Sequence, residues 1–197
     1  MSRKIIVAGG ILAFLISGGL VLGAEQGDYS FGVMFMAGGR YDNIRMCVAS
    51  PAGTRGGPIA DIMLVTRYSL SSRTALAFHL PVMRPVLFGI RFDMLQFEPE
   101  FTLEFKKRLN DKRALVTGPG LGLSFHYGPD YNSDLDNRGE DFWALGPFLS
   151  WNVGLAFERE GTTRSRIGLK LFYVPLFARD RADGTVLGAA LTYHYFF

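Results

Sequence analysis

The sequence predicts an all-β protein, an eight-stranded antiparallel up-and-down barrel that spans a membrane. Three observations favour this fold. Apolar residues recur at every second position along eight segments, the alternate positions hold small or charged residues that suit a narrow interior, and short connections alternate with long ones. The chain has 197 residues and no low-complexity linker, so we expect one barrel domain over residues 25–197.

The first 24 residues have the three-part pattern of a secretory signal peptide. Residues 3–4 are basic, a long apolar stretch follows, and polar residues begin at Glu25. The small residues Gly23 and Ala24 predict cleavage before Glu25, with cleavage after Gly23 as the alternative. The competing interpretation is a retained membrane helix, because the apolar stretch approaches the roughly 20 residues that span a bilayer. Glycines weaken such a helix, so we expect a signal peptide over residues 1–24.

The alternation is clearest between Leu95 and Lys106, where odd positions are apolar and even positions are polar. Successive side chains of a strand point to opposite faces, so this pattern predicts a strand, whereas a helix would mix the two sets. We expect the odd-numbered side chains from Leu95 through Phe105 to face lipid. The same alternation recurs in residues 29–35, 62–68, 76–82, 115–125, 145–157, 167–173 and 187–197.

The face opposite the large apolar residues decides between a soluble sandwich and a membrane barrel. A soluble sandwich buries its large apolar side chains in a core and turns its charges to water. Here the opposite face is rich in glycine, alanine and serine, which suits the crowded interior of a narrow barrel whose large apolar side chains meet lipid. We therefore expect the barrel to span a membrane.

The alternation of strand side chains between two faces, here called strand parity, places a set of charged side chains inside the lumen. Buried charges must pair, so we expect a salt-bridge network that plugs the barrel together with Phe148, Phe172 and Phe196. A catalytic carboxylate pair or an ion path is the alternative. The inward charges are Asp61, Arg67, Glu98, Glu100, Glu104, Lys106, Glu158 and Lys170.

Two features fit a regular barrel less well. Residues 83–94 break the parity of their neighbours and are too apolar for an exposed loop, so we expect a tight hairpin at the outer membrane interface. Pro99, Pro119, Pro147 and Pro175 lie inside predicted strands, where each removes a ladder hydrogen bond. We expect bulges or irregular pairing at these prolines, and a count of ten strands remains an alternative.

The chain ends in "LTYHYFF", in which Leu191, Tyr193, Tyr195 and Phe197 occupy alternate positions. This ending resembles the terminal strand of bacterial outer-membrane β-barrels, and the periodicity of the rest is similar to the small OmpA/OmpX/OmpW-like barrels. No motif assigns a subfamily. The resemblance implies residence in the bacterial outer membrane and an assembly signal, formed by these four residues, that the barrel-assembly machinery reads. Aromatic rings also prefer the membrane boundary.

The connections then predict an orientation. Short ones are expected near residues 69–73, 109–113 and 158–166, and long ones near 39–58 and 128–142. In such barrels short turns face the periplasm and long loops face outward. Both chain ends therefore lie on the periplasmic side.

Neither catalytic residues nor a cofactor or metal site is predicted. His79, His126 and His194 point inward, but His126 and His194 lie near opposite ends and do not share an ion. Some outer-membrane barrels modify lipid A, and Ser124 and His126 lie near the outer rim. The deacylase family, however, has a serine two residues after the histidine, where this chain has Gly128. We expect a protein that is not an enzyme.

The outer loops are the parts free to meet a partner. Without Arg3 and Lys4 the chain is close to neutral, so no nucleic acid is expected. The single Cys47 forms no internal disulfide and is either a spare apolar residue or a free thiol. One loop is basic and suits lipopolysaccharide, with Arg40, Tyr41, Arg45 and Arg55. The other is acidic, lacks the spacing of an EF-hand calcium loop, and carries Asp130, Asp134, Asp136, Glu140 and Asp141.

These observations predict a monomeric, non-enzymatic outer-membrane barrel with a lumen plugged by side chains. Its contacts would be membrane lipid, lipopolysaccharide and the assembly machinery. We expect it to contribute to envelope integrity or to surface interaction through its outer loops. A lipid A-modifying enzyme and a narrow channel for small solutes are the alternatives.

Overall fold

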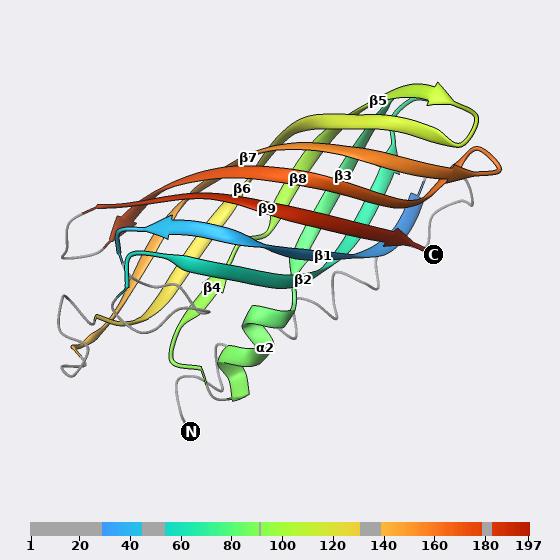
Figure 1. Ribbon diagram of the computed structural model, residues 1–197. Coiled ribbons are helices and arrows are strands. Elements are labelled where there is room, and N and C mark those ends of the chain that lie inside the picture. The colour runs from blue at the N-terminus through green and yellow to red at the C-terminus, as the bar shows by residue number, and fades with distance from the viewer. Residues whose placement is uncertain (1–28, 45–53, 91, 131–138, 179–182) are drawn as a thin grey trace.

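The computed structural model describes residues 29–44, 54–90, 92–130, 139–178 and 183–197. The predicted signal peptide and Cys47 lie outside these residues, as do Arg45, Asp134 and Asp136 of the predicted loops. The described chain is mostly β-strand and curves into a barrel (Figure 1). In chain order its elements are β1 (Tyr29–Asp42), β2 (Gly57–Ser69), β3 (Thr74–Pro81), α2 (Met83–Ile90), β4 (Leu95–Phe97), β5 (Glu100–Asn110), β6 (Arg113–Pro129), β7 (Asp141–Arg159), β8 (Thr162–Ala178) and β9 (Gly184–Phe196).

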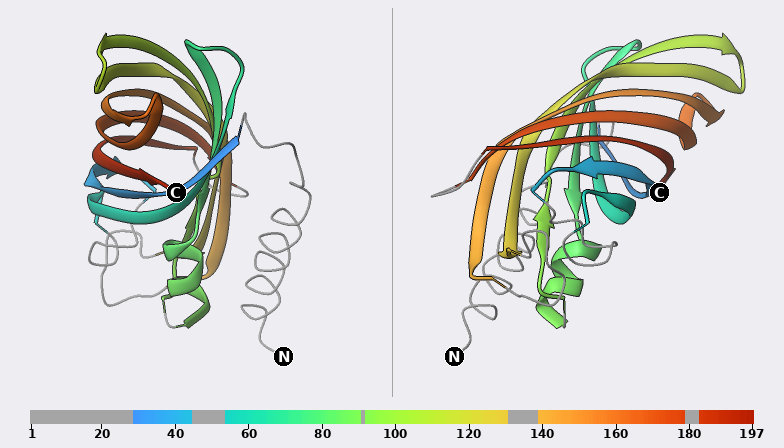
Figure 2. Two further views of the ribbon diagram at one scale, coloured as in Figure 1. Left: turned by 90° about the vertical axis from the view of Figure 1, so that its right-hand side faces the viewer. Right: turned by 60° about the vertical axis from the view of Figure 1, so that its left-hand side comes forward.

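The strands form a closed antiparallel ring. In the order β1, β2, β3, β5, β6, β7, β8 and β9 each strand pairs with the next, and β9 pairs with β1. β4 and β5 both pair with β6 along one line, so together they act as a single interrupted strand. Figure 2 shows the resulting barrel from two further sides. The predicted eight-stranded antiparallel barrel is confirmed, and the alternative of ten strands is wrong.

The register of the pairs shows that the strands are staggered. A line of paired residues that starts at Phe31 runs once around the barrel and returns to β1 at Tyr41. A closed barrel requires such a stagger, because its strands must tilt against the axis. Between these ends the line passes through Thr66, Phe78, Phe101, Leu121, Leu149, Tyr173 and Leu187.

Prolines interrupt the hydrogen-bonded ladders without shifting the register. Pro99 separates β4 from β5, yet both strands keep the same alignment with β6. Its carbonyl accepts the amide of Leu123 at 3.2 Å, and a side chain at Gly122 would lie 2.1 Å from that carbonyl oxygen. Pairing of β7 with β8 is likewise absent where Pro147 would face Pro175. The predicted irregular pairing is confirmed here, and its cause is the missing amide hydrogen of proline.

The short connections lie at the end of the barrel that holds the C-terminus (Figure 1). β7 and β8 are joined by Glu160 and Gly161, whose φ angles of 54° and 78° suit the tight turn of a hairpin. The predicted connection over residues 158–166 is therefore too long. The predicted connection over residues 39–58 is also too long, because β1 continues through Asp42.

Residues 83–94 do not form the predicted hairpin. Met83–Ile90 is the helix α2, which follows the end of β3 (Figure 1). Pro85 lies in its first turn, where a missing amide hydrogen removes no helical hydrogen bond. α2 packs against β2 and β4, the elements that continue beyond the end of β3. Within the described chain, no helical segment combines the length and apolar character needed to cross a bilayer.

The outer face is apolar and the inner face is closely packed. Phe148, Phe172 and Phe196 are buried inside, as predicted. Leu95 differs from the prediction that it faces lipid, because it is buried where α2 packs against β4. Large side chains that are exposed on the outer face include Leu64, Phe101, Leu121, Trp151 and Leu191.

Replacing Phe101 with arginine tests which face meets lipid. Phe101 is 53% exposed in the middle of the interrupted β4–β5 strand, and an arginine near the bilayer midplane costs roughly 2–4 kcal/mol of folding free energy. Leu109→Arg, at the end of the same strand, is the matched control and should cost about 0–1 kcal/mol. Urea unfolding in lipid vesicles measures both costs. Equal small costs, with solubility in the absence of detergent, would contradict the assignment.

Candidate functional site

Charged side chains gather inside the barrel. A buried charge is unfavourable unless it is paired and hydrogen-bonded. The structure places all the charges that strand parity selected on the inner face, and each belongs to an ion pair: Asp61, Arg67, Glu98, Glu100, Glu104, Lys106, Glu158 and Lys170. Because the partners come from different elements, the pairs cross the lumen and link its walls.

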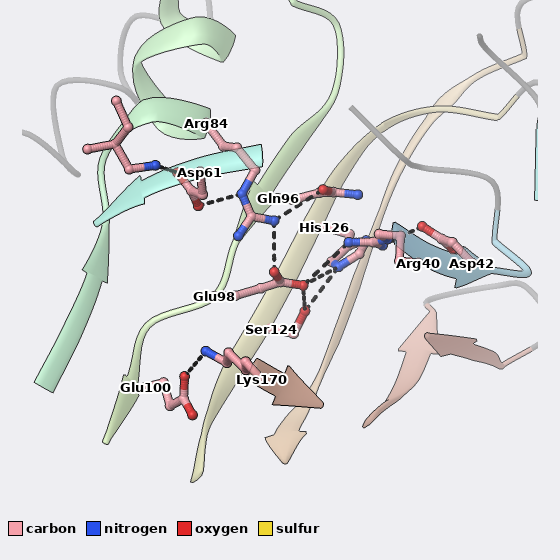
Figure 3. Close-up of polar contacts among 11 residues, drawn as sticks. Arg40, Asp42, Asp61, Arg84, Gln96, Glu98, Glu100, Ser124, His126 and Lys170 are labelled. Carbon is pink, nitrogen blue, oxygen red and sulfur yellow. Dashed lines mark hydrogen bonds and ion pairs between the residues drawn. The ribbon is translucent and has the colours of Figure 1, made fainter. Parts of the chain in front are cut away.

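The guanidinium of Arg84 is the centre of one cluster. Its Nε donates to Oδ2 of Asp61 at 2.6 Å, and its Nη1 donates to Oε2 of Glu98 at 2.7 Å and to Oε1 of Gln96 at 3.2 Å (Figure 3). Two carboxylates and one amide oxygen thus surround the guanidinium, which offsets the cost of burying its charge. Arg84 thus links α2 to β2 and to the break between β4 and β5.

The local sequence explains how a helix delivers this arginine to the lumen. Arg84 and Phe88 are four residues apart and therefore share one face of α2, and both are buried. The Phe88 ring meets Tyr127 edge-on with 5.9 Å between the ring centres. On the opposite face Val86 and Ile90 are exposed. The amphipathic helix therefore turns its buried face, and Arg84 with it, toward the barrel.

Ser124 and His126 support the carboxylate of Glu98. The Ser124 hydroxyl donates to Oε1 of Glu98 at 3.1 Å, and Nε2 of His126 lies 3.0 Å from the hydroxyl oxygen and 3.4 Å from Oε1 (Figure 3). A catalytic triad needs the carboxylate on the second ring nitrogen. Among the described residues, Nδ1 of His126 has no hydrogen-bond partner. All three side chains are buried, so this arrangement fits the anchoring of a carboxylate.

Arg40 and Asp42 extend this cluster toward β1. Nη2 of Arg40 lies 2.5 Å from Oδ2 of Asp42, and Nη1 lies 3.6 Å from Oε1 of Glu98. The prediction that Arg40 belongs to a basic outer surface is therefore wrong. β1 continues beyond Gly39, and strand parity turns its even-numbered side chains inward. Tyr41 points outward and is exposed.

Glu100 and Lys170 form the middle of the lumen. The Lys170 ammonium donates to Oε2 of Glu100, and the Ser150 hydroxyl donates to its Oε1. Nδ1 of His79 lies 3.7 Å from Oε2 of the same carboxylate. The Lys170 ammonium also lies 4.9 Å from the centre of the Phe148 ring, within the range of a cation–π contact. The charged pair is thus enclosed by polar and aromatic groups.

Glu104 continues the charges toward the end that holds the C-terminus. It accepts from Nε of Arg67 at 2.8 Å and from Nη1 of Arg166 at 2.5 Å. Nη2 of Arg166 lies 2.8 Å from Nε2 of His194. One carboxylate therefore holds two arginines from β2 and β8, on different parts of the wall.

Glu158 is the last carboxylate of the inner face in this direction among the described residues. It pairs with Lys106 and lies 3.6 Å from Nε of Arg108, whose side chain is 58% exposed. From Asp61 and Arg84 to Glu158 and Lys106, the ion pairs follow one another through the lumen. We call this series the axial ion-pair network.

The sequence pattern missed four members of the network: Arg40, Asp42, Arg84 and Arg166. Three of them, Arg40, Asp42 and Arg166, lie inside predicted connections where the strands in fact continue. Extending the strand alternation into these connections would have found them. Arg84 lies in the segment whose parity fails. No spacing in the sequence places it, because its position depends on where β3 ends and α2 begins.

The inward histidines are divided between two clusters. The rings of His79 and His194 have centres 5.7 Å apart, while His126 belongs to the separate cluster around Glu98. Within residues 29–44, 54–90, 92–130, 139–178 and 183–197, no group of three or more His, Cys, Asp or Glu side chains is arranged to hold a metal ion.

The comparisons with known proteins show similarity in fold. No family model and no curated protein matches the chain by sequence. The crystal structure of Neisserial surface protein A is similar, with a TM-score of 0.53 and 10% sequence identity over 87% of this chain and 100% of that chain. The chain has the fold of the small eight-stranded outer-membrane barrels.

Two further solved structures are similar at lower scores. Ail, the attachment invasion locus protein of Yersinia pestis, solved with the heparin analogue sucrose octasulfate, matches with a TM-score of 0.37 and 14% identity over 87% of this chain and 100% of that chain. The N-terminal β-barrel domain of Pseudomonas aeruginosa OprF matches with a TM-score of 0.37 and 11% identity over 84% of this chain and 97% of that chain.

Replacing Arg84 with methionine tests its place in the network. Asp61 and Glu98 would lose their main cation, and removal of one member of a buried ion pair costs roughly 3–5 kcal/mol of folding free energy. Arg108→Met removes a largely exposed partner and should cost at most about 1 kcal/mol. Urea unfolding in lipid vesicles measures both. Adding Asp61→Asn and Glu98→Gln to Arg84→Met should restore part of the loss, and equal effects of the two single variants would contradict the assignment.

Proposed function

We propose that this chain is a non-enzymatic barrel of the bacterial outer membrane, that its lumen is closed to solutes, and that it acts through its outer end in envelope integrity or surface interaction. The axial ion-pair network carries this proposal. Eight strands enclose a space just wide enough for side chains to fill. The network shares that space with buried apolar side chains such as Met34, Phe148 and Phe172, which leaves little room for a passing solute.

The lipid-facing surface supports a place in the outer membrane. Leu191, Tyr193, Tyr195 and Phe197 are all exposed on the outer face at the end of the chain, and aromatic rings favour the membrane boundary. We propose that the barrel-assembly machinery recognises these residues. Export would use the N-terminal signal peptide, with cleavage before Glu25.

The outer end offers charged groups of both signs. Arg55 is exposed on the connection between β1 and β2, Glu140 is exposed on the connection between β6 and β7, and Asp141 is exposed at the start of β7. Asp130, which the sequence assigned to the same acidic surface, is only 9% exposed. We propose that the monomer is surrounded by membrane lipid and that the basic side contacts anionic lipopolysaccharide, since binding residues generally lie on loops held by a rigid scaffold.

Planar-bilayer recordings test the closed lumen. The purified protein should show no stable conductance, because paired charges and aromatic rings fill the barrel. Replacing both Glu100 and Lys170 with alanine removes the central ion pair and leaves no buried charge without its partner. This double variant should conduct small ions. A large and stable conductance of the unmodified protein would contradict the proposal and support a channel.

Shortening the two outer connections tests where a partner binds. Removing residues 45–53 should weaken binding to lipopolysaccharide-coated surfaces, whereas removing residues 131–138 should not. The first connection carries the basic Arg55, and the second leads to the acidic Glu140 and Asp141. Heat-dependent gel migration confirms folding of both variants. If neither deletion changes binding while loss of the whole protein still makes the outer membrane more permeable, the contact with lipopolysaccharide is wrong and the structural role remains.

A further inference from the structure

The end of the barrel that holds the C-terminus carries an excess of positive charge. The turns that join β2 to β3, β5 to β6 and β7 to β8 all lie at this end (Figure 1). Acidic side chains on these turns and the adjoining strand ends are Asp111, Glu158 and Glu160. Basic side chains outnumber them and include Arg73, Lys107, Arg108, Lys112, Arg113 and Arg164.

Part of this charge lines two hollows that share Ser72, Lys106 and Arg108. One has a volume of about 600 Å³ and also includes Arg67 and Thr162. The other has a volume of about 650 Å³ and extends along the β2–β3 turn. Volumes of roughly 300–1,000 Å³ are usual for sites that bind small ligands. We call the two hollows together the basic mouth.

The basic mouth contains cations that no carboxylate of the described residues neutralises. Lys106 and Arg108 share the carboxylate of Glu158. No carboxylate of the described residues forms an ion pair with Arg73 or Lys107, which line the second hollow. An anion that entered here would therefore meet cations without displacing an internal partner.

The rim of the basic mouth is held in place by backbone contacts. The hydroxyl oxygen of Ser71 accepts the amides of Arg73 at 3.2 Å and Thr74 at 3.0 Å. The amide of Lys106 donates to the carbonyl oxygen of Arg73 at 2.7 Å. These contacts fix the β2–β3 turn beside β5. A site that is formed before the ligand arrives loses less conformational entropy on binding.

The position of the basic mouth favours a ligand that arrives from water. Arg67 and Lys106 are inward side chains at the end of the lumen that holds the C-terminus, and each is 15% exposed. Lipid headgroups surround the outside of a barrel and do not reach its inner face, although they can reach Lys107, whose odd position in β5 places it on the outer face with Phe101 and Phe105. In the orientation proposed above, this end faces the periplasm, so the ligand would come from that compartment.

We propose that the basic mouth binds a carboxylate-bearing peptide or glycan of the periplasm, such as the peptide-substituted glycan of the cell wall. Arginine and lysine side chains donate charge-assisted hydrogen bonds to carboxylates. The hydroxyls of Ser72 and Thr162 offer donors and acceptors for sugar hydroxyls and amides. This inference rests on the orientation in the proposed function and adds a contact on the inner side of the membrane.

Titration calorimetry with a soluble disaccharide–tetrapeptide fragment of the cell wall tests the proposal. The full protein is placed in phosphatidylcholine nanodiscs, and the same fragment with its carboxyl groups amidated is the neutral comparison. The acidic fragment should bind, and binding should weaken with added salt. Arg73→Gln combined with Arg108→Gln should weaken binding by about tenfold or more, since two charged contacts are lost.

The matched control is Arg113→Gln combined with Arg164→Gln, which removes the same charge from the same end but outside the two hollows. It should change the affinity by less than about twofold. Equal losses in both double variants would overturn the proposal, because they would show a response to overall charge alone. Equal binding of the amidated fragment, or no binding of the acidic one, would overturn it as well. Loss of fragment binding when the nanodiscs contain phosphatidylglycerol would show that lipid headgroups reach the same cations, and it would overturn the assignment to a periplasmic ligand.

A separate measurement distinguishes this inference from the proposed orientation. Ser72→Cys in a Cys47→Ser background places a thiol at the basic mouth. A membrane-impermeant maleimide should label it only after the outer membrane is opened. Labelling in intact cells would overturn the orientation and this inference together. Protection in intact cells without binding of the fragment would overturn this inference alone.

Discussion

Charges inside a narrow barrel must be paired across the lumen, and much of this structure follows from that constraint. Removing water from a carboxylate or an ammonium group is unfavourable, and only a close partner with good hydrogen bonds offsets it. Here Glu98, Glu100 and Glu104 follow one another along one strand line and take cations from α2, β8 and β2. The pairs hold the walls at a fixed separation and fill the space between them.

The same constraint explains why a helix belongs in the wall of this barrel. β3 ends at Pro81, while β2 and β4 continue past it. An open strand edge is not tolerated within a membrane, because its backbone groups lack partners. α2 satisfies its own backbone and packs between these elements, and Arg84 fixes it to Asp61 and Glu98. Arg84 therefore contributes both to the packing of the wall and to the ion pairs inside the barrel.

The two ends of the barrel are left with different surfaces. Charges within the lumen balance one another, so the exposed groups at the ends determine what each end can meet. One end exposes Arg55 together with Glu140 and Asp141. The other end exposes Arg73 and Lys107, which form no ion pair with a carboxylate of the described residues. Loops and turns on a rigid scaffold present such groups in fixed positions.

The sequence by itself determined the barrel and most of its inner face. Period-two alternation assigns every residue of a strand to one of two faces, so the sequence alone places Glu98, Glu100 and Lys170 in the lumen. The tertiary structure decided what the alternation does not encode. Which cation meets which carboxylate depends on the register and tilt of strands far apart in the sequence, as between Glu100 and Lys170. The conformation of residues 83–90 was likewise decided by packing, because an apolar stretch of that length suits a hairpin or a helix, and only the end of β3 at Pro81 leaves a space that a helix fills.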